Sequence, residues 1–175
     1  MSTMSAEPDV ELLTPEGAEL LQATRDLLED YARHITEMGG HPELDGYEEE
    51  LRTLPGEYAE SAGGALLLAL VDGEPAGCCA LRCAGDAGFP EAAEMKRLFV
   101  RPVFRGFGLG RQLAEAAREA AMRLGYTAVL LDTLDTMQPA RTLYSSLGFE
   151  PTDPWRNDAP AGTQFLRAEL DHIPE

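Results

Sequence analysis

Hydrophobic positions along the chain follow two different periods, one typical of helices and one typical of strands. Apolar residues recur three and four positions apart over residues 15–35 and 109–124, which predicts two amphipathic helices. Thr14 is the expected N-cap of the first helix, with Pro15 at its first position. Two further helices are predicted at 47–54 and 138–147, and strands at 9–14, 63–71, 76–83, 91–100, 127–133, 149–153 and 163–170.

The order of these elements predicts the fold class. Two apolar runs on either side of the turn signal Asp72-Gly73 indicate an antiparallel hairpin, and a strand–helix–strand crossover follows later. The expected fold is therefore α/β, with a mixed, mostly antiparallel central sheet and helices on both faces. Residues 1–8 are expected to be a flexible polar tail, and residues 9–175 one domain, without an internal repeat.

Charge and hydropathy narrow the classes of function. The formal net charge of −17 disfavours binding to nucleic acid, because such a surface repels phosphates. High acidity keeps a protein soluble, and it also attracts cationic small molecules. No apolar run is long enough to span a membrane, and the start MSTMSAEPDVELL lacks the features of a signal peptide. We therefore predict a cytoplasmic protein without a membrane partner.

The three cysteines, Cys78, Cys79 and Cys83, lie in one predicted strand. They form no C-x-x-C pair, and no histidine follows at the spacing of a zinc site, so no metal is predicted. Neighbouring Cys78 and Cys79 are expected on opposite faces of the strand. All three are interpreted as free, buried thiols.

The stretch RGFGLG, residues 105–110, lies between a predicted strand and a predicted helix. The first amides of a helix lack internal partners, and the helix dipole favours an anion there, so this loop is a candidate phosphate site. Its G-x-G-x-G spacing matches neither a P-loop nor the G-x-G-x-x-G of a dinucleotide fold. A glycine turn that only reverses the chain remains the alternative.

Two blocks of sequence resemble one family. KRLFVRPVFRGFGLGRQLAEAA (96–117) is similar to motif A of the GNAT superfamily of N-acetyltransferases, whose loop signature is (Q/R)-x-x-G-x-(G/A). ARTLYSSLGFEP (140–151) resembles the later helix–strand motif of the same superfamily. The resemblance implies splayed central strands and acetyl-CoA as cosubstrate. It further implies transfer of an acetyl group to a primary amine of a small molecule or peptide, by direct attack in a ternary complex.

The resemblance also implies which residues bind acetyl-CoA. The pyrophosphate is expected on the amides of the glycine loop and beside its two arginines, and the pantetheine arm is expected along the preceding strand. The main-chain N–H of Leu98 is the candidate donor to the thioester carbonyl. The expected cofactor-binding residues are Leu98, Phe99, Val100, Arg105, Gly106, Phe107, Gly108, Leu109, Gly110 and Arg111.

Tyr144 and Glu94 are the candidate catalytic residues. Tyr144 matches the general acid of the family by its place in LYSSLGF, and the alternative is a tyrosine half-buried on a helix face. Glu94 is the candidate base, and the alternative is an ion pair with an arginine. Asp132 is a second base candidate. Strict alternation places Glu94, Lys96, Leu98 and Val100 on one face of their strand, and Met95, Arg97 and Phe99 on the other.

The acceptor amine is expected to bind near the first two helices. The candidate contacts are Tyr31, His34, His41 and Tyr47, together with Asp132. Residues 48–50, EEE, are interpreted as a solvated helix face. Met137 stands where many members of the family have an asparagine that hydrogen-bonds pantetheine, and methionine cannot make that bond.

A non-catalytic acyl-CoA-binding or sensing domain is the alternative function, and the retained glycine loop and Tyr144 favour the enzyme. Members of the family are often homodimers, although the sequence does not fix the oligomeric state.

Overall fold

The computed structural model describes residues 7–37, 46–134, 138–156, 159 and 161–170. These residues form seven strands in one sheet with the spatial order β1-β2-β3-β4-β5-β7-β6. The strands are β1 (Val10–Leu13), β2 (Ala65–Val71), β3 (Glu74–Cys83), β4 (Ala92–Val100), β5 (Ala128–Leu134), β6 (Glu150–Pro151) and β7 (Thr163–Glu169). The α-helices are α1 (Gly17–Glu37), α2 (Tyr47–Arg52), α3 (Leu109–Arg123) and α4 (Gln138–Ser146).

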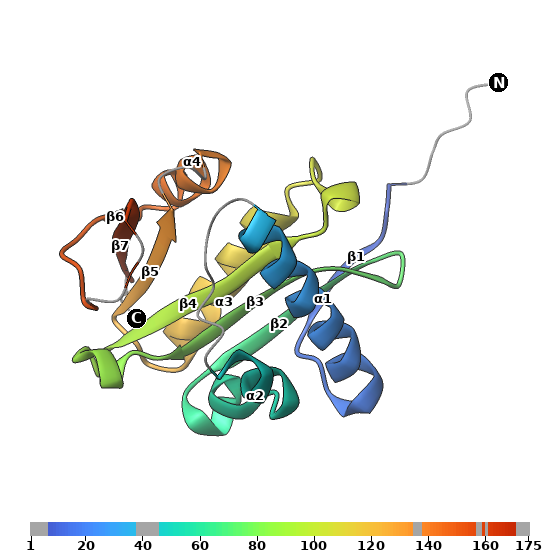
Figure 1. Ribbon diagram of the computed structural model, residues 1–175, viewed down its shortest axis with the longest axis horizontal. Helices are drawn as coiled ribbons and strands as arrows, with labels where there is room; N and C mark the ends of the chain where they lie inside the picture. The colour runs from blue at the N-terminus through green and yellow to red at the C-terminus, as the bar shows by residue number, and fades with distance from the viewer. Residues whose placement is uncertain (1–6, 38–45, 135–137, 157–158, 160, 171–175) are drawn as a thin grey trace.

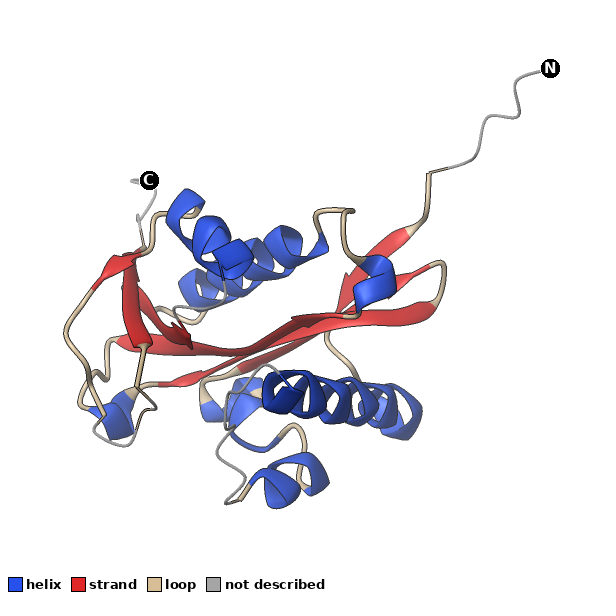
Figure 2. Ribbon diagram, turned by 45° about the horizontal axis from the view of Figure 1, so that its top comes forward, coloured by secondary structure: helices blue, strands red, loops and turns tan. Residues whose placement is uncertain are grey.

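Helices cover both faces of the sheet (Figure 2). On one face, α1 and α2 bury Leu27, Leu28 and Tyr47 against side chains of β2, β3 and β4. On the other face, α3 buries Leu113 and a row of alanines against the same strands and against β5. The small alanine side chains let the helix lie close to the sheet. The predicted α/β class with helices on both faces is confirmed.

The sheet is antiparallel except where β4 pairs with β5. That parallel pairing covers only Ala92, Ala93 and Glu94, opposite residues 128–130. Beyond Glu94 the two strands diverge, and Figure 1 shows β5 turning away from β4 towards α4. The predicted splay of the central strands is therefore present, and it opens the sheet in its middle.

A β-bulge in β4 breaks the predicted alternation of its side chains. Arg97 has φ 62°, and the pairing with β3 shifts register between Cys78 and Ala80. Leu98 therefore packs on the α3 side together with Met95, whereas Lys96 lies on the α2 side. The prediction that Glu94 and Lys96 share a face with Leu98 and Val100 was wrong, because an extra residue at a bulge reverses the alternation after it.

Two smaller predictions were also wrong. The first helix begins at Gly17, not at Pro15, because the left-handed φ of +85° at Gly17 prevents the right-handed helix from extending back to the residues before it. Cys83, the last residue of β3, is exposed. Cys78 and Cys79 are buried on opposite faces as predicted, and burial raises the pKa of the Cys78 thiol to about 12.

Within the described ranges, no helix combines the length and the apolar character that a membrane crossing requires. The same residues contain no group of three or more histidine, cysteine, aspartate or glutamate side chains placed to bind a metal ion.

Candidate active site

The glycine loop joins β4 to α3 through a short 3-10 turn at Pro102–Phe104. Gly106 and Gly108 have φ +95° and +73°, a conformation that other residues rarely adopt. Gly108 is the N-cap of α3, and no side chain caps the helix there. The first amides of α3 therefore lack a side-chain partner and lie at the positive end of the helix dipole, which is the arrangement of an anion site.

The two arginines of the loop contact different elements. The Arg105 guanidinium donates to the main-chain oxygen of Val100 at 3.1 Å. Arg111 donates to the Ser146 hydroxyl at 2.8 Å and pairs with Glu115 at 3.0 Å. Both arginines lie within a few residues of the uncapped start of α3, so their positive charge adds to the field of the helix end.

Tyr144 lies on α4 and is 8% exposed. Its ring packs edge-on against Phe149, with centroids 5.8 Å apart. Burial raises the pKa of the Tyr144 phenol well above its usual value, and the nearby Asp132 carboxylate raises it further. The phenol is therefore protonated at neutral pH, as a general acid must be before it reacts.

Asp132 lies near the end of β5, on the splayed side of the sheet. Burial raises the pKa of its carboxyl group, and an ion pair with Arg156 at 2.6 Å acts in the opposite direction. Glu94 raises this pKa as well, whereas Lys96 and Arg97 lower it. Charged residues of β4 thus shift the pKa of Asp132, and Asp132 raises the pKa of Tyr144, so these side chains lie in one region of the structure.

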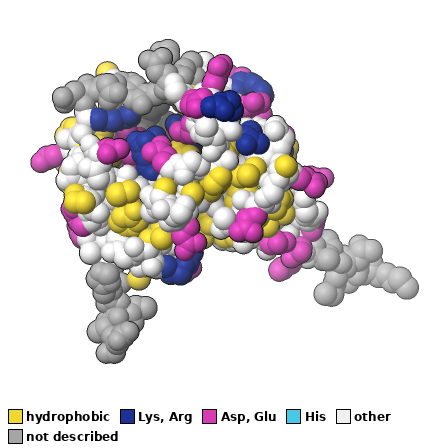
Figure 3. Space-filling model, turned by 90° about the horizontal axis from the view of Figure 1, so that it is seen from below, with side chains coloured by type: hydrophobic (Ala, Val, Ile, Leu, Met, Phe, Trp, Pro, Cys, Tyr) yellow, Lys and Arg dark blue, Asp and Glu magenta, His cyan; other side chains and the backbone are white. Residues whose placement is uncertain are grey.

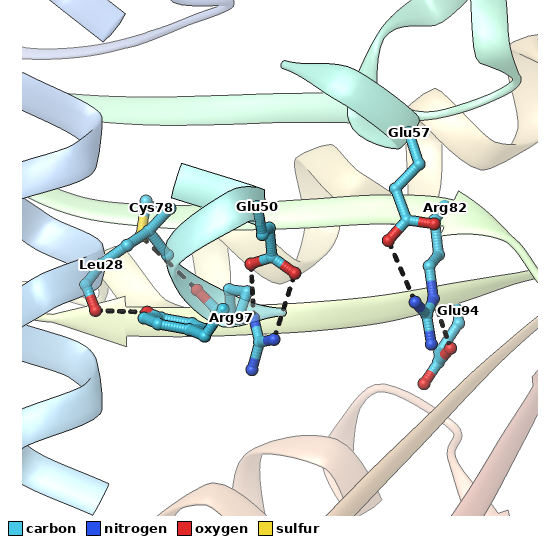
Figure 4. Close-up of polar contacts among 8 residues, drawn as sticks. Leu28, Glu50, Glu57, Cys78, Arg82, Glu94 and Arg97 are labelled. Carbon is cyan, nitrogen blue, oxygen red and sulfur yellow. Dashed lines mark hydrogen bonds and ion pairs between the residues drawn. The ribbon is translucent and has the colours of Figure 1, made fainter. Parts of the chain in front are cut away.

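Glu94 is 6% exposed and forms an ion pair with Arg82, with Nε and Oε2 2.8 Å apart. Arg82 also pairs with Glu57 at 3.0 Å, so one guanidinium lies between two carboxylates (Figure 4). The ion pair considered for Glu94 from the sequence is therefore present. Its role as a base stays a prediction.

The residues predicted to bind the acceptor surround Phe99 and Arg97. The rings of Tyr31 and His34 have their centroids 6.0 Å and 5.9 Å from that of Phe99. The Arg97 guanidinium lies 4.9 Å from the centroid of the Tyr47 ring, which favours a cation–π contact. The structure thus brings Tyr31, His34 and Tyr47 together, while His41 and Met137 lie outside the described residues.

Glu50 corrects the interpretation of residues 48–50. Glu48 and Glu49 are exposed as expected, but Glu50 is half-buried and accepts two hydrogen bonds of 3.2 Å from Arg97 (Figure 4). The acidic stretch is therefore not a purely solvated face. Glu50 instead holds the guanidinium of Arg97 in place.

A cavity of about 310 Å³ lies between α2, the following 3-10 turn and strands β3 and β4. Its charged side chains are Arg82, Lys96 and Arg97 from the strands, opposite Glu49, Glu50 and Glu57. Seen from the side of α2, acidic and basic side chains lie next to one another (Figure 3). This cluster was not predicted from the sequence, although charged residues inside the apolar runs 76–83 and 91–100 are a signal for it.

Known proteins resemble the chain in sequence and in fold. The sequence model of the acetyltransferase (GNAT) family matches residues 21–149. An uncharacterized N-acetyltransferase of Schizosaccharomyces pombe is 34% identical over 137 residues, 78% of this chain and 82% of the relative. N-acetylaspartate synthetase of Danio rerio is 33% identical over 92 residues, 53% of this chain but only 32% of that protein.

Among solved structures, YncA of Salmonella typhimurium with its cofactor acetyl-CoA has a TM-score of 0.73 at 20% sequence identity. The alignment covers 94% of this chain and 96% of YncA, so the two share a fold. The chain belongs to the GNAT family of acetyltransferases. This membership confirms the family resemblance and the prediction of acetyl-CoA as the cosubstrate.

Proposed function

We propose that the protein is an acetyl-CoA-dependent N-acetyltransferase acting on a primary amine of a small molecule or peptide. The observation that carries this proposal is the opening between β4 and β5, which pair over three residues only. The uncapped start of α3 follows β4 in the chain, and α4 with its buried, protonated Tyr144 follows β5. One end of the opening thus suits an anion, and a proton donor lies on the other side.

The donor is proposed to bind along this opening. Its pyrophosphate lies on the amides of Phe107, Gly108, Leu109 and Gly110, beside Gly106, Arg105 and Arg111. Glycine at 106 and 108 leaves space there, because a Cβ at either position would meet no atom within 4 Å. The pantetheine arm lies along Leu98, Phe99 and Val100, the part of β4 that β5 leaves unpaired.

Acetyl transfer then needs an oxyanion donor, an acid and a base. A neutral amine attacks the thioester carbonyl, a C–N bond forms and the C–S bond breaks. The main-chain N–H of Leu98 stabilises the charge that develops on the carbonyl oxygen. Tyr144 gives its proton to the departing thiolate, and the amine gives its extra proton to a base.

Asp132 fits the role of base better than Glu94 does. Its pKa is raised towards the working pH, which improves proton transfer, and its charge is close enough to Tyr144 to affect the phenol. Both carboxylates form an ion pair, Asp132 with Arg156 and Glu94 with Arg82, so the raised pKa of Asp132 and its effect on Tyr144 are what distinguish it. We therefore expect Asp132→Asn to lower kcat more than Glu94→Gln does. A larger loss of kcat in the Glu94→Gln variant would show that Glu94 is the base.

The deciding experiment is a free-thiol release assay with acetyl-CoA and a panel of primary amines that includes polyamines, aminoglycosides, amino acids and short peptides. Calorimetric titration with CoA is run beside it. Release of CoA with any amine supports the transferase. Binding of CoA without release from the whole panel supports a non-catalytic acyl-CoA-binding domain, and no binding of CoA contradicts both.

A further inference from the structure

Lys96 is the only lysine of the chain, and it lies in β4 just beyond the point where this strand loses its parallel partner. The last residue pair between β4 and β5 joins Glu94 to Leu130. The same register, continued by two residues, places Lys96 level with Asp132 of β5, with the opening between the two strands. A side-chain amine thus lies at the start of the segment along which the acetyl donor is proposed to bind.

Lys96 and Asp132 also lie on the same face of the sheet. Val129 and Leu131 of β5 belong to the core on the α3 side, so the alternation of side chains along the strand places Asp132 on the opposite face. Lys96 lines the cavity beside α2 and therefore lies on that face too. The charge of Lys96 lowers the pKa of the Asp132 carboxyl group, which agrees with this proximity. An amine and the candidate base are thus neighbours at the opening.

The proposed position of the thioester is within reach of this amine. The main-chain N–H of Leu98, the proposed donor to the thioester carbonyl, follows two residues later in β4, a span of about 7 Å along a strand. Main-chain N–H groups of a strand point sideways in the plane of the sheet, towards the neighbouring strand. The side chain of Lys96 leaves this plane on the α2 side, and its flexible four-carbon stem can carry the amine back over the opening.

The surroundings of Lys96 make its amine more reactive than that of an exposed lysine. Burial lowers the pKa of Lys96 below its ordinary value, and two neighbouring arginines lower it further, while two neighbouring glutamates oppose the shift. A larger fraction of the amine is therefore neutral at neutral pH. Only a neutral amine has the free electron pair that attacks a carbonyl carbon, so partial burial favours attack by Lys96.

We propose that bound acetyl-CoA acetylates Lys96 of its own chain, so that the protein carries a modification site beside its donor site. The Lys96 nitrogen attacks the thioester carbonyl, a C–N bond forms and the C–S bond breaks. Tyr144 gives a proton to the departing thiolate, Asp132 takes the extra proton of the amine, and solvent returns a proton to Tyr144. The products are CoA and Nε-acetyl-lysine. This inference rests on the proposed transferase function, because it uses the same donor, acid and base, but it needs no external acceptor.

The single lysine makes the test direct. The protein is incubated with acetyl-CoA at neutral pH without an acceptor, and mass spectrometry of the intact chain follows the reaction. We expect a gain of one acetyl group, which peptide mapping locates on Lys96 and separates from any acetylation of the amino terminus. Lys96→Arg keeps the positive charge and should not gain this group. A wild-type protein whose Lys96 stays unmodified would overturn the proposal.

An exposed lysine in the same chain controls for chemical acetylation in solution. Arg52→Lys introduces one on α2, at a side chain that is 70% exposed. We expect this lysine to be acetylated at least tenfold more slowly than Lys96, because it has no bound thioester beside it. Equal rates at the two positions would show that acetyl-CoA from solution modifies both, which contradicts the proposal.

Two further measurements test whether the bound donor reacts within one chain. Excess desulfo-CoA competes for the donor site but carries no thioester, so it should slow the acetylation of Lys96 at least tenfold. At saturating acetyl-CoA the rate constant should stay the same when the protein is diluted tenfold. Acetylation that desulfo-CoA leaves unchanged, or that slows on dilution, would refute transfer from the chain's own donor site.

The outcome of this test is separable from that of the proposed function. If Lys96 is acetylated but no amine of the panel releases CoA, transfer to an external amine fails and the modification site stands. If an amine releases CoA while Lys96 stays unmodified, the transferase stands and the present inference fails. Tyr144→Phe should slow the acetylation of Lys96 and the turnover of an external amine by a similar factor, because both reactions use the same acid.

Discussion

Tyr144 shows how one buried side chain becomes suited to its proposed reaction. The phenol packs against Phe149 in the core beside α3, and burial keeps its proton in place. A phenol with an ordinary pKa already holds its proton at neutral pH, and the raised pKa extends this protonated range upwards. Loss of activity by deprotonation of Tyr144 is therefore not expected at any pH up to 10.

We expect Tyr144→Phe to lower kcat by about 100-fold, the lower end of the range for general acid–base catalysis. The ring and its contact with Phe149 remain, so the fold and the affinity for CoA should change little. Stopped-flow or steady-state thiol release measures kcat, and calorimetry measures the Kd of CoA. An unchanged kcat would show that another group, or water, protonates the thiolate.

Lys96 links the charge of the cavity to the stability of the fold. Burial lowers the pKa of Lys96 below its ordinary value of 10.5, and the neighbouring charges of Arg97 and Arg82 add to this effect. Glu94 and Glu50 oppose it. Folding that lowers the pKa of a basic group favours its neutral form, so the group contributes fully to stability only above the pKa of the unfolded chain. This contribution is lost as the pH falls through the folded pKa. At pH 7 the charged form therefore destabilises the folded protein.

Without a ligand, Lys96→Met should thus be more stable than the wild type at pH 7, and the difference should shrink as the pH rises towards 10.5. A gain of 1 kcal/mol in a protein of this size corresponds to a rise in Tm of roughly 2–4 °C. Urea or thermal unfolding of both proteins at several pH values measures the difference. If the variant is less stable at pH 7, the ammonium group has a partner in solution that contributes to the fold.

At the scale of elements, the glycine loop depends on its backbone conformation. Gly108 has φ +73° at the N-cap of α3, and a side chain there disfavours this conformation by about 1–2 kcal/mol. We expect Gly108→Val to weaken CoA binding at least tenfold, because the helix start would rotate its amides away from the phosphate. Calorimetric titration with CoA measures this change.

Gly88 offers a matched control for that variant. It has φ +92° in the turn between β3 and β4, and a Cβ there also meets no atom within 4 Å. Gly88→Val should lose stability to a similar extent while it keeps the wild-type affinity for CoA. If both variants bind CoA equally well, the assignment of the pyrophosphate to the glycine loop is wrong.

Local sequence patterns predicted most elements but not the details of β4. The hairpin of β2 and β3 and the helix α3 follow from periodicity and turn residues, because neighbours in the chain determine them. The bulge at Arg97 does not follow from the local sequence pattern, because that pattern predicts only a strand whose side chains alternate strictly between two faces. The Arg97–Glu50 and Arg82–Glu57 pairs join residues 47 and 25 positions apart, and no local pattern encodes such contacts.

The candidate site was predictable to the extent that motifs carry it. The glycine loop and Tyr144 were found because their neighbours in the chain define them, and the resemblance assigned their roles. The cavity around Lys96 and Tyr58 was missed, because it forms only when α2, β3 and β4 come together. The sequence also did not predict which arginine pairs with Glu94, because Arg82 lies beside Glu94 only when β3 pairs with β4.

At the scale of the whole molecule, the sheet has one weak junction. β1 to β4 form a continuous antiparallel part, and β5 to β7 form another, with three residue pairs between β4 and β5. The α3 helix packs on both parts and helps to join them. A ligand bound between β4 and β5 would add contacts across this junction, so its binding should stabilise the whole fold and not only the glycine loop.

We therefore expect CoA to raise Tm and to slow amide exchange on both sides of the opening. At a concentration of 100 times Kd, binding adds about 2.7 kcal/mol, which corresponds to roughly 5–11 °C in Tm for a protein of this size. Hydrogen exchange should slow most in β4 after Glu94 and in the second half of β5, the segments that lack each other as partners. The Gly108→Val variant, at the same CoA concentration, should show a smaller shift. Protection confined to the start of α3, with β4 and β5 unchanged, would place the pantetheine arm outside the opening and contradict the proposed binding mode.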